Sequence, residues 1–247
     1  GTPVWIPGDV EGVCCGVPFS SKGYAEAHAF AVNRAVERFW EWSDGGRLPV
    51  VVDTSPCTYG LKGSRASLTP ENQARFDQLE ILDGVAFTHD TLLPKLGAKR
   101  KAGAVALHPV CSLTKMDLGA KLEGIARFCS DDVTVPLSAG CCAFAGDRGF
   151  LHPELTASAT KNEAAEVRAK GCEEHLSSSR TCEIGMTRAT GEVYRSYVFL
   201  LERVTRDRGD EEDVGTSRAP SARGRAGGAP HGAPSGTGSQ TSTTVPS

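Results

Sequence analysis

Seven of the nine cysteines in this 247-residue chain follow a pattern that suits metal binding. Two adjacent pairs are each followed by a helix-like run and then by a lone cysteine, and a further cysteine precedes the second pair by 30 residues. The seven are Cys14, Cys15, Cys57, Cys111, Cys141, Cys142 and Cys182. Thiolates are the preferred ligands of soft metals and of iron–sulfur clusters, and one cluster takes four of them. We therefore expect these seven residues to be metal ligands.

The two groups of cysteines differ in their ligand count. The second group contains four thiols, which is the full number for a 4Fe-4S cluster. They belong to Cys111, Cys141, Cys142 and Cys182. The first group shows only three, and the counterpart of Cys111 would fall before Gly1. The sequence thus predicts one complete site and one whose fourth ligand lies upstream of Gly1.

Other uses of the cysteines remain open. Zinc is the alternative metal, although structural zinc sites usually show close pairs such as C-x2-C, which are absent here. Cα atoms of adjacent residues lie about 3.8 Å apart, too close for the usual disulfide span, so neither pair is expected to bridge internally. A zinc-binding or scaffold module that docks a dehydrogenase, and a thiol–disulfide redox sensor that uses the adjacent cysteines, are the alternative functions.

Two further cysteines and one histidine are expected to have structural roles. Free cysteine is among the most buried residue types, so Cys129 and Cys172 are predicted to be core residues within helices. His108 precedes a proline at the end of a predicted strand, and beside Cys111 it could either ligand a metal or tune a nearby sulfur. Because such a histidine is at least as often structural, it is left out of the ligand set.

Composition and charge narrow the class of protein. A net charge of -3 provides no basic surface, so nucleic acid is not an expected partner. The odd cysteine count and the lack of a secretory signal favour reduced thiols and a cytoplasmic protein. No apolar run approaches the roughly 18 residues of a membrane span, which leaves peripheral attachment to the inner face of the membrane as an option.

The elements expected to position the cysteines alternate between strands and helices. Strands are predicted at 49–53, 104–107, 133–135 and 175–178, and the first should be buried on both faces. Helices are predicted at 24–42, 113–128 and 153–170, with a helix and connection at 70–96. The cysteines follow the strands, and open α/β sheets bind ligands at the carboxyl edge.

Two spacings indicate a duplicated unit. Cys15 and Cys142 are 127 residues apart, and Cys57 and Cys182 are 125 apart. The predicted fold class is therefore α/β, with two pseudo-repeated modules of short parallel strands flanked by helices, and cysteines on strand-end loops. The modules are assigned to 1–97 and 98–204, and 205–247 is predicted to be a disordered tail because it is rich in Gly, Pro, Ser and Thr.

The cysteine segments resemble a known family. Five stretches carry the likeness: Cys14-Cys15-Gly16 with Phe19-Ser20-Ser21-Lys22-Gly23, Asp53-Thr54-Ser55-Pro56-Cys57-Thr58-Tyr59-Gly60, His108-Pro109-Val110-Cys111-Ser112, Gly140-Cys141-Cys142-Ala143-Phe144-Ala145-Gly146-Asp147-Arg148-Gly149, and Ser179-Arg180-Thr181-Cys182-Glu183-Ile184-Gly185. They resemble the cysteine-rich CCG domain of the heterodisulfide reductase B subunit and of the iron–sulfur subunits of glycolate oxidase and anaerobic glycerol-3-phosphate dehydrogenase. The closer resemblance is to the C-terminal part of fused FAD-linked oxidoreductases of the D-lactate dehydrogenase (cytochrome) type.

The resemblance implies part of an enzyme. An N-terminal portion would carry FAD and the substrate site for D-lactate or a similar 2-hydroxy acid, and this segment would pass electrons through iron–sulfur centres to a quinone or cytochrome. The implied partners are thus an FAD-binding dehydrogenase domain or subunit and that acceptor, with no catalytic residue in this segment. The chain departs from the family pattern at Ala143, which replaces the glycine of CCG, and it lacks the second cysteine of the wider family's terminal C-x-x-C.

Overall fold

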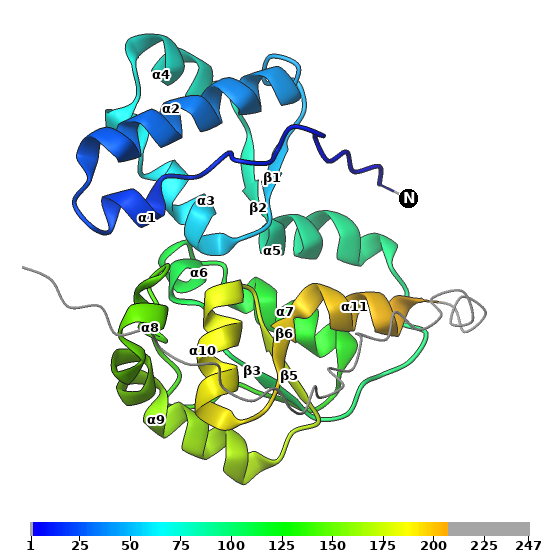
Figure 1. Cartoon of the computed structure of the whole chain (residues 1–247). Helices are drawn as coiled ribbons and strands as arrows, with labels where there is room; N and C mark the ends of the chain where they lie inside the picture. The colour runs from blue at the N-terminus through cyan, green and yellow to red at the C-terminus, as the bar shows by residue number, and fades with distance from the viewer. Residues whose placement is uncertain (1, 207–247) are drawn as a thin grey trace, which may run out of the picture. The chain divides into compact units, whose positions relative to one another are not determined.

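The computed structural model describes residues 2–206 and shows a mixed α/β protein with parallel strands in two sheets (Figure 1). The predicted fold class is confirmed. The helices are α1 (Val17–Ser20), α2 (Ala25–Trp42), α3 (Ser55–Lys62), α4 (Pro70–Phe76), α5 (Gly84–Phe87), α6 (Cys111–Lys115), α7 (Gly119–Cys129), α8 (Arg148–Leu151), α9 (Pro153–Lys170), α10 (Arg180–Thr190) and α11 (Tyr197–Thr205). Shorter helical turns are η1 (Arg65–Ser67), η2 (Thr88–Leu92) and η3 (Leu93–Lys95). The strands are β1 (Val50–Val52), β2 (Ile81–Asp83), β3 (Val105–Leu107), β4 (Val133–Thr134), β5 (Glu174–Ser177) and β6 (Tyr194–Ser196).

The first sheet consists of β1 and β2, which run parallel with Val50 opposite Ile81. Helix α2 packs beside it and buries a stripe of apolar side chains, including Ala35 and Phe39. The prediction that β1 is buried on both faces is wrong. The side chain of Val51 is 38% exposed, because the described residues supply only this one neighbouring strand and a helical layer on one side.

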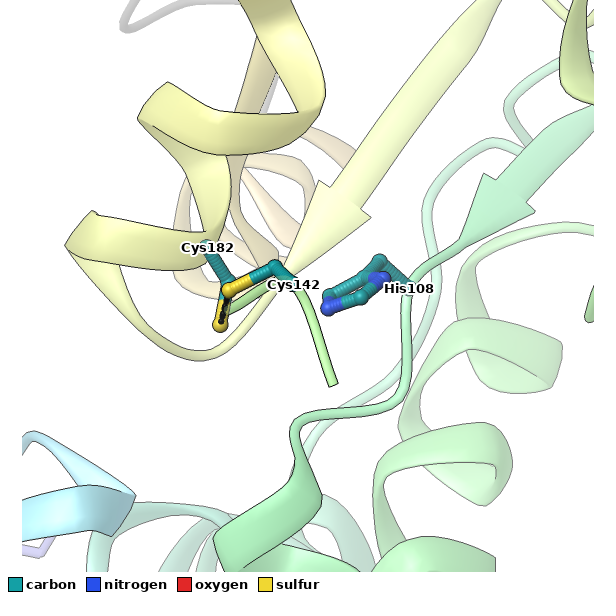
Figure 2. A group of neighbouring side chains, drawn as sticks. All are labelled: His108, Cys142 and Cys182. Carbon is teal, nitrogen blue, oxygen red and sulfur yellow. Dashed lines mark hydrogen bonds between the residues drawn. The ribbon is translucent and has the colours of Figure 1, made fainter. Parts of the chain in front are cut away.

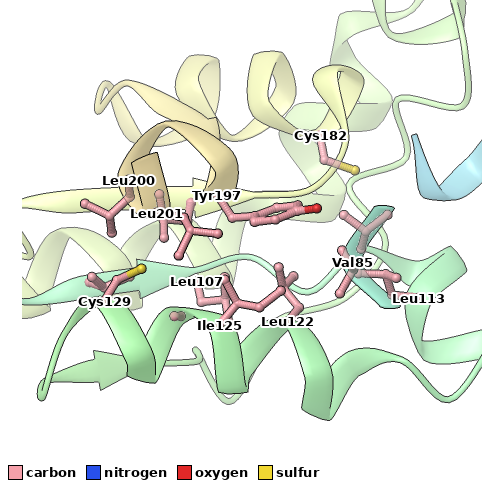
Figure 3. Close-up of a cluster of buried hydrophobic side chains, with 14 of the residues drawn as sticks. Val85, Leu107, Leu113, Leu122, Ile125, Cys129, Cys182, Tyr197, Leu200 and Leu201 are labelled. Carbon is pink, nitrogen blue, oxygen red and sulfur yellow. The ribbon is translucent and has the colours of Figure 1, made fainter. Parts of the chain in front are cut away.

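The second sheet has four parallel strands in the order β4-β3-β5-β6. All three residues of β3 are buried. Because alternate residues point to opposite sides of a strand, β3 is buried on both faces. Val105 and Leu107 pack in a cluster with α7 and α11 (Figure 3), whereas Ala106 packs against Val167 of α9. Helices α7 and α11 therefore cover one face, and α9 covers the other.

The second module repeats the order of the first. In each, an adjacent cysteine pair is followed by a one-turn helix, a helix of 18 residues, a strand, a cysteine-bearing helix and a second parallel strand, although η1 and α4 precede that second strand in the first module alone. Cys57 is the third residue of α3, and Cys182 is the third residue of α10. The spacing of the cysteines thus reflects a repeated structural unit.

Residues 84–95 connect the two sheets. They pack against the core of the second sheet, where Val85 is 1% exposed and the hydroxyl of Thr88 lies 3.3 Å from that of Tyr197. All of the described residues fall within one compact unit.

Several local predictions need correction. Strands β2 and β6 were not predicted, since each has only three residues and β2 lies in a segment whose apolar residues recur every three positions. Cys57, Cys111 and Cys182 lie in the first turn of a helix rather than in an irregular loop. Cys172 lies in the turn after α9, not within a helix, because Gly171 ends α9 with a φ of 64°.

The last two expectations concern the C-terminal tail and membrane-spanning helices. The predicted disordered tail lies outside the described residues from position 207 onward. Among residues 2–206, none of the helices combines the length and hydrophobicity that crossing a membrane requires.

Candidate metal centre

The second sheet places three functional side chains at its carboxyl edge. The chain passes from β3 to β4 on one side and then returns to β5 on the other side of β3, so the connections after β3 and β5 diverge. Ligands bind in open α/β sheets at such a switch point. His108 directly follows β3, Cys182 follows β5, and Cys142 follows β4.

These three side chains form a buried group that could hold a metal ion. One ligand atom from each, the sulfurs of Cys142 and Cys182 and a ring nitrogen of His108, lies within 4.8 Å of the others. The two sulfurs are 3.1 Å apart. Figure 2 shows the imidazole extending from the connection after β3 toward the two cysteines. Two thiols and an imidazole are a donor set that suits zinc and iron.

A carboxylate holds the imidazole of His108 in place. Its Nδ1 atom lies 2.7 Å from Oε1 of Glu163 in α9, and neither side chain is more than 2% exposed. The Nε2 atom is buried and has no hydrogen-bond partner among the described residues. Buried polar atoms are nearly always paired, so this unpaired nitrogen is a fitting feature for a metal ligand.

The protonation of His108 depends on its neighbours. Burial lowers the pKa of the imidazole, but its interactions with Cys142 and Glu163 outweigh burial and raise the pKa to about 9. The metal-free ring is therefore protonated at neutral pH, beside a thiolate and a carboxylate. A metal ion at Nε2 would replace that proton, as ligand binding by histidine requires.

The remaining two cysteines of the second group lie beside these three residues. The thiols of Cys111 and Cys141 interact, because a hydrogen bond with Cys111 lowers the pKa of Cys141 to about 6 and the same contact raises the pKa of Cys111. The pKa of Cys182 is raised by its hydrogen bond with Cys142, by burial and by the charges of Cys142, Cys111 and Cys141. Cys111 and Cys141 therefore interact electrostatically with Cys142 and Cys182. Among the described residues, however, the group whose ligand atoms lie within 4.8 Å of one another contains His108, Cys142 and Cys182 and neither of these two cysteines.

The first group of cysteines has the same arrangement with fewer members. The sulfurs of Cys15 and Cys57 lie 2.8 Å apart. This contact is the main reason why the pKa of Cys15 falls to about 6 and that of Cys57 rises, and Cys14 affects both. The structure thus brings Cys15 and Cys57 into contact and places Cys14 near enough to affect their pKa values, and all three residues are half-buried.

Both cysteine pairs use the same backbone turn. The sulfur of Cys14 accepts a hydrogen bond from the N–H of Gly16, and the sulfur of Cys141 accepts one from Ala143, each at 3.4 Å. Gly16 has a φ of 77° and Ala143 has a φ of 54°. Ala143 therefore has the same left-handed conformation as Gly16, although this conformation strains a residue with a Cβ by about 1–2 kcal/mol.

Opposite substitutions at these two turns should have opposite effects on stability. Ala143→Gly is expected to raise the free energy of unfolding by about 0.5–1 kcal/mol, because relief of strain exceeds the entropy lost by glycine. Gly16→Ala should lower it by about 2–4 kcal/mol, since the new Cβ would lie 2.7 Å from Nδ1 of His28 and 2.9 Å from Val32. Urea unfolding followed by circular dichroism measures both. A loss of stability in Ala143→Gly would show that the turn is not strained.

Sequence reasoning missed His108 and Glu163. The signal for His108 was its position directly after a strand and three residues before Cys111, but its role depends on Glu163, which lies 55 residues further along the chain. The prediction that Cys129 and Cys172 are buried is confirmed, since they are 1% and 8% exposed and belong to hydrophobic clusters. Burial is the main cause of the raised pKa of both thiols, which reaches about 11 for Cys129.

The fold and the site together define an α/β protein with a buried cysteine and histidine group that could hold a metal ion. No protein-family model matches the chain, and a search of curated proteins found none with significant similarity.

Proposed function

We propose that this chain is the iron–sulfur electron-transfer portion of a flavin-dependent dehydrogenase. The observation that supports it best is the pair of buried thiols of Cys142 and Cys182, whose sulfurs lie 3.1 Å apart and to which Cys111 and Cys141 are electrostatically coupled. Four thiolates are the ligand count of one 4Fe-4S cluster. A bound cluster would supply one-electron transfer, and the protein would supply its ligands, burial and hydrogen bonds.

The donor set fits such a group chemically. Metal ligation requires deprotonated thiols. The contact with Cys182 is the main cause that lowers the pKa of Cys142 to about 5, so this thiol is a thiolate at neutral pH before any metal binds. The same contact raises the pKa of Cys182, so a bound metal would displace the proton of this thiol.

The proposed reaction context comes from the sequence resemblance. We propose that the partner is an FAD-binding dehydrogenase domain or subunit that oxidises D-lactate or a similar 2-hydroxy acid, and that a quinone or cytochrome accepts the electrons. The chain itself would then carry electrons rather than transform the 2-hydroxy acid.

Zinc binding is the second candidate function. The specific observation in its favour is the trio of His108, Cys142 and Cys182, because two cysteines and one histidine are a familiar zinc ligand set. In that case the chain would be a non-catalytic module that docks onto a dehydrogenase.

Anaerobic reconstitution of the full chain separates these functions. The metal-free protein would be incubated with ferrous iron and sulfide, or with zinc, and then analysed for metal, acid-labile sulfide and the EPR signal after reduction. We expect iron and sulfide to be retained in equal amounts with an EPR signal from the reduced cluster. Stoichiometric zinc without any such signal would refute the electron-transfer function.

A further inference from the structure

We infer that His108 is a metal ligand of the second centre through Nε2, and that Glu163 is the positioning residue that fixes its ring. This inference rests on the proposed function, because it requires a metal at the centre. It adds an imidazole to a ligand set that the sequence assigns to thiolates alone.

The first argument is the direction of the hydrogen bond. A carboxylate only accepts hydrogen bonds, so Nδ1 of His108 must carry the proton that lies between it and Glu163 at 2.7 Å. If a metal displaces the proton on Nε2, the lone pair of Nε2 is then free to bind that metal on the side of Cys142 and Cys182. A carboxylate that accepts from the far nitrogen is the usual partner of a metal-bound histidine.

The second argument is the burial of both groups. His108 is fully buried and Glu163 is 2% exposed, and they reach the centre from separate elements, the connection after β3 and helix α9. At this depth Nε2 makes no hydrogen bond to a nitrogen or oxygen atom among residues 2–206, and the group that interacts with the ring on this side is the thiol of Cys142. A ring nitrogen of His108 lies within 4.8 Å of the sulfurs of Cys142 and Cys182.

The inference changes the expected chemistry of the centre. A 4Fe-4S cluster has four ligand positions, so an imidazole at one of them leaves one of the four thiols unused. Cys141 is the exposed member of the group and is the best candidate for that thiol. A neutral imidazole also makes the cluster less negative than a thiolate does, which raises its reduction potential.

Pulsed EPR on the reduced, reconstituted full chain, labelled with ¹⁵N-histidine, tests the ligand directly. We expect the coupling of a directly bonded nitrogen, lost in His108→Ala. His175→Gln is the matched control, because His175 is another buried histidine on the neighbouring strand, and its ring packs against Tyr194 and does not belong to the group with Cys142 and Cys182. Its nitrogen coupling should equal that of the wild type.

Titration of the metal-free chain with Co²⁺ tests the positioning role of Glu163. Loss of a carboxylate behind a metal-bound histidine typically costs 10–100-fold in affinity, so Glu163→Ala should weaken Co²⁺ binding by about that factor. Glu163→Gln keeps an oxygen acceptor and should recover most of the loss. Circular dichroism of each metal-free variant checks that it is folded.

The outcomes separate the inference from the proposed function. If the wild type retains an iron–sulfur cluster but shows no bonded nitrogen, and Glu163→Ala binds Co²⁺ as tightly as the wild type, the inference is wrong and the function stands. If the wild type retains neither cluster nor Co²⁺, the proposed function fails and the inference fails with it.

Discussion

Cys142→Ser is expected to remove most of the iron–sulfur signal from the reconstituted protein. Cys142 is central to the group, since its sulfur lies 3.1 Å from that of Cys182 and within 4.8 Å of a ring nitrogen of His108. Its pKa of about 5 makes it the thiol of the second group that ionises most readily. A serine hydroxyl remains protonated at neutral pH and is a poor ligand for a soft metal. Iron analysis and EPR measure the loss.

Cys172→Ser is the matched control for this experiment. Cys172 is also buried, at 8% exposed, but it packs with Ala106 and Val167 away from the cysteine group. Its substitution should leave iron content and the EPR signal unchanged. Equal losses in Cys142→Ser and Cys172→Ser would show that the signal reports general stability rather than ligation.

Phe144→Ala is expected to lower the free energy of unfolding by about 3–5 kcal/mol, the usual cost of truncating a fully buried aromatic side chain. The ring is 0% exposed and meets Phe150 edge to face, with centroids 4.8 Å apart. Its atoms occupy the space beside Gly149, where a Cβ would lie 2.5 Å from the ring. The ring therefore anchors the segment that follows Cys142, and its removal should also weaken metal binding. Urea unfolding measures the stability change.

Phe150→Ala provides the comparison. Phe150 is 55% exposed, so its truncation mainly removes two contacts of its ring. One is the contact with the ring of Phe144, and the other is the cation–π contact with Arg188, whose guanidinium carbon lies 5.3 Å from the ring centroid. We expect a loss of about 1 kcal/mol, in the range of a single aromatic pair. Similar losses for both phenylalanines would mean that Phe144 is not the anchor of this segment.

The long helices could be predicted from the sequence because their signals are local. Helix α9 begins at Pro153 and ends at Lys170, as predicted, since proline suits the first helical position and Gly171 adopts the left-handed conformation that ends the helix. Helix α2 likewise follows its apolar periodicity. Strands β2 and β6 could not be found in the same way. Three residues carry no periodicity, and these strands exist because β1 and β5 offer them backbone partners.

In the candidate site, too, some features follow from local sequence and others only from tertiary contacts. The sequence alone placed Cys142 and Cys182 in one group, because the repeated order of strand and helix sets the spacing of the cysteines, and their sulfurs lie 3.1 Å apart. That Cys111 and Cys141 complete the ligand set stays a prediction. Only the tertiary structure decided that His108 belongs with Cys142 and Cys182. Glu163 holds Nδ1 of His108, and the rest of the imidazole therefore faces the two sulfurs. Glu163 lies on α9, which packs on the opposite face of the sheet from α7. Such a contact between distant residues leaves no local pattern, and so it becomes visible only once the sheet is assembled.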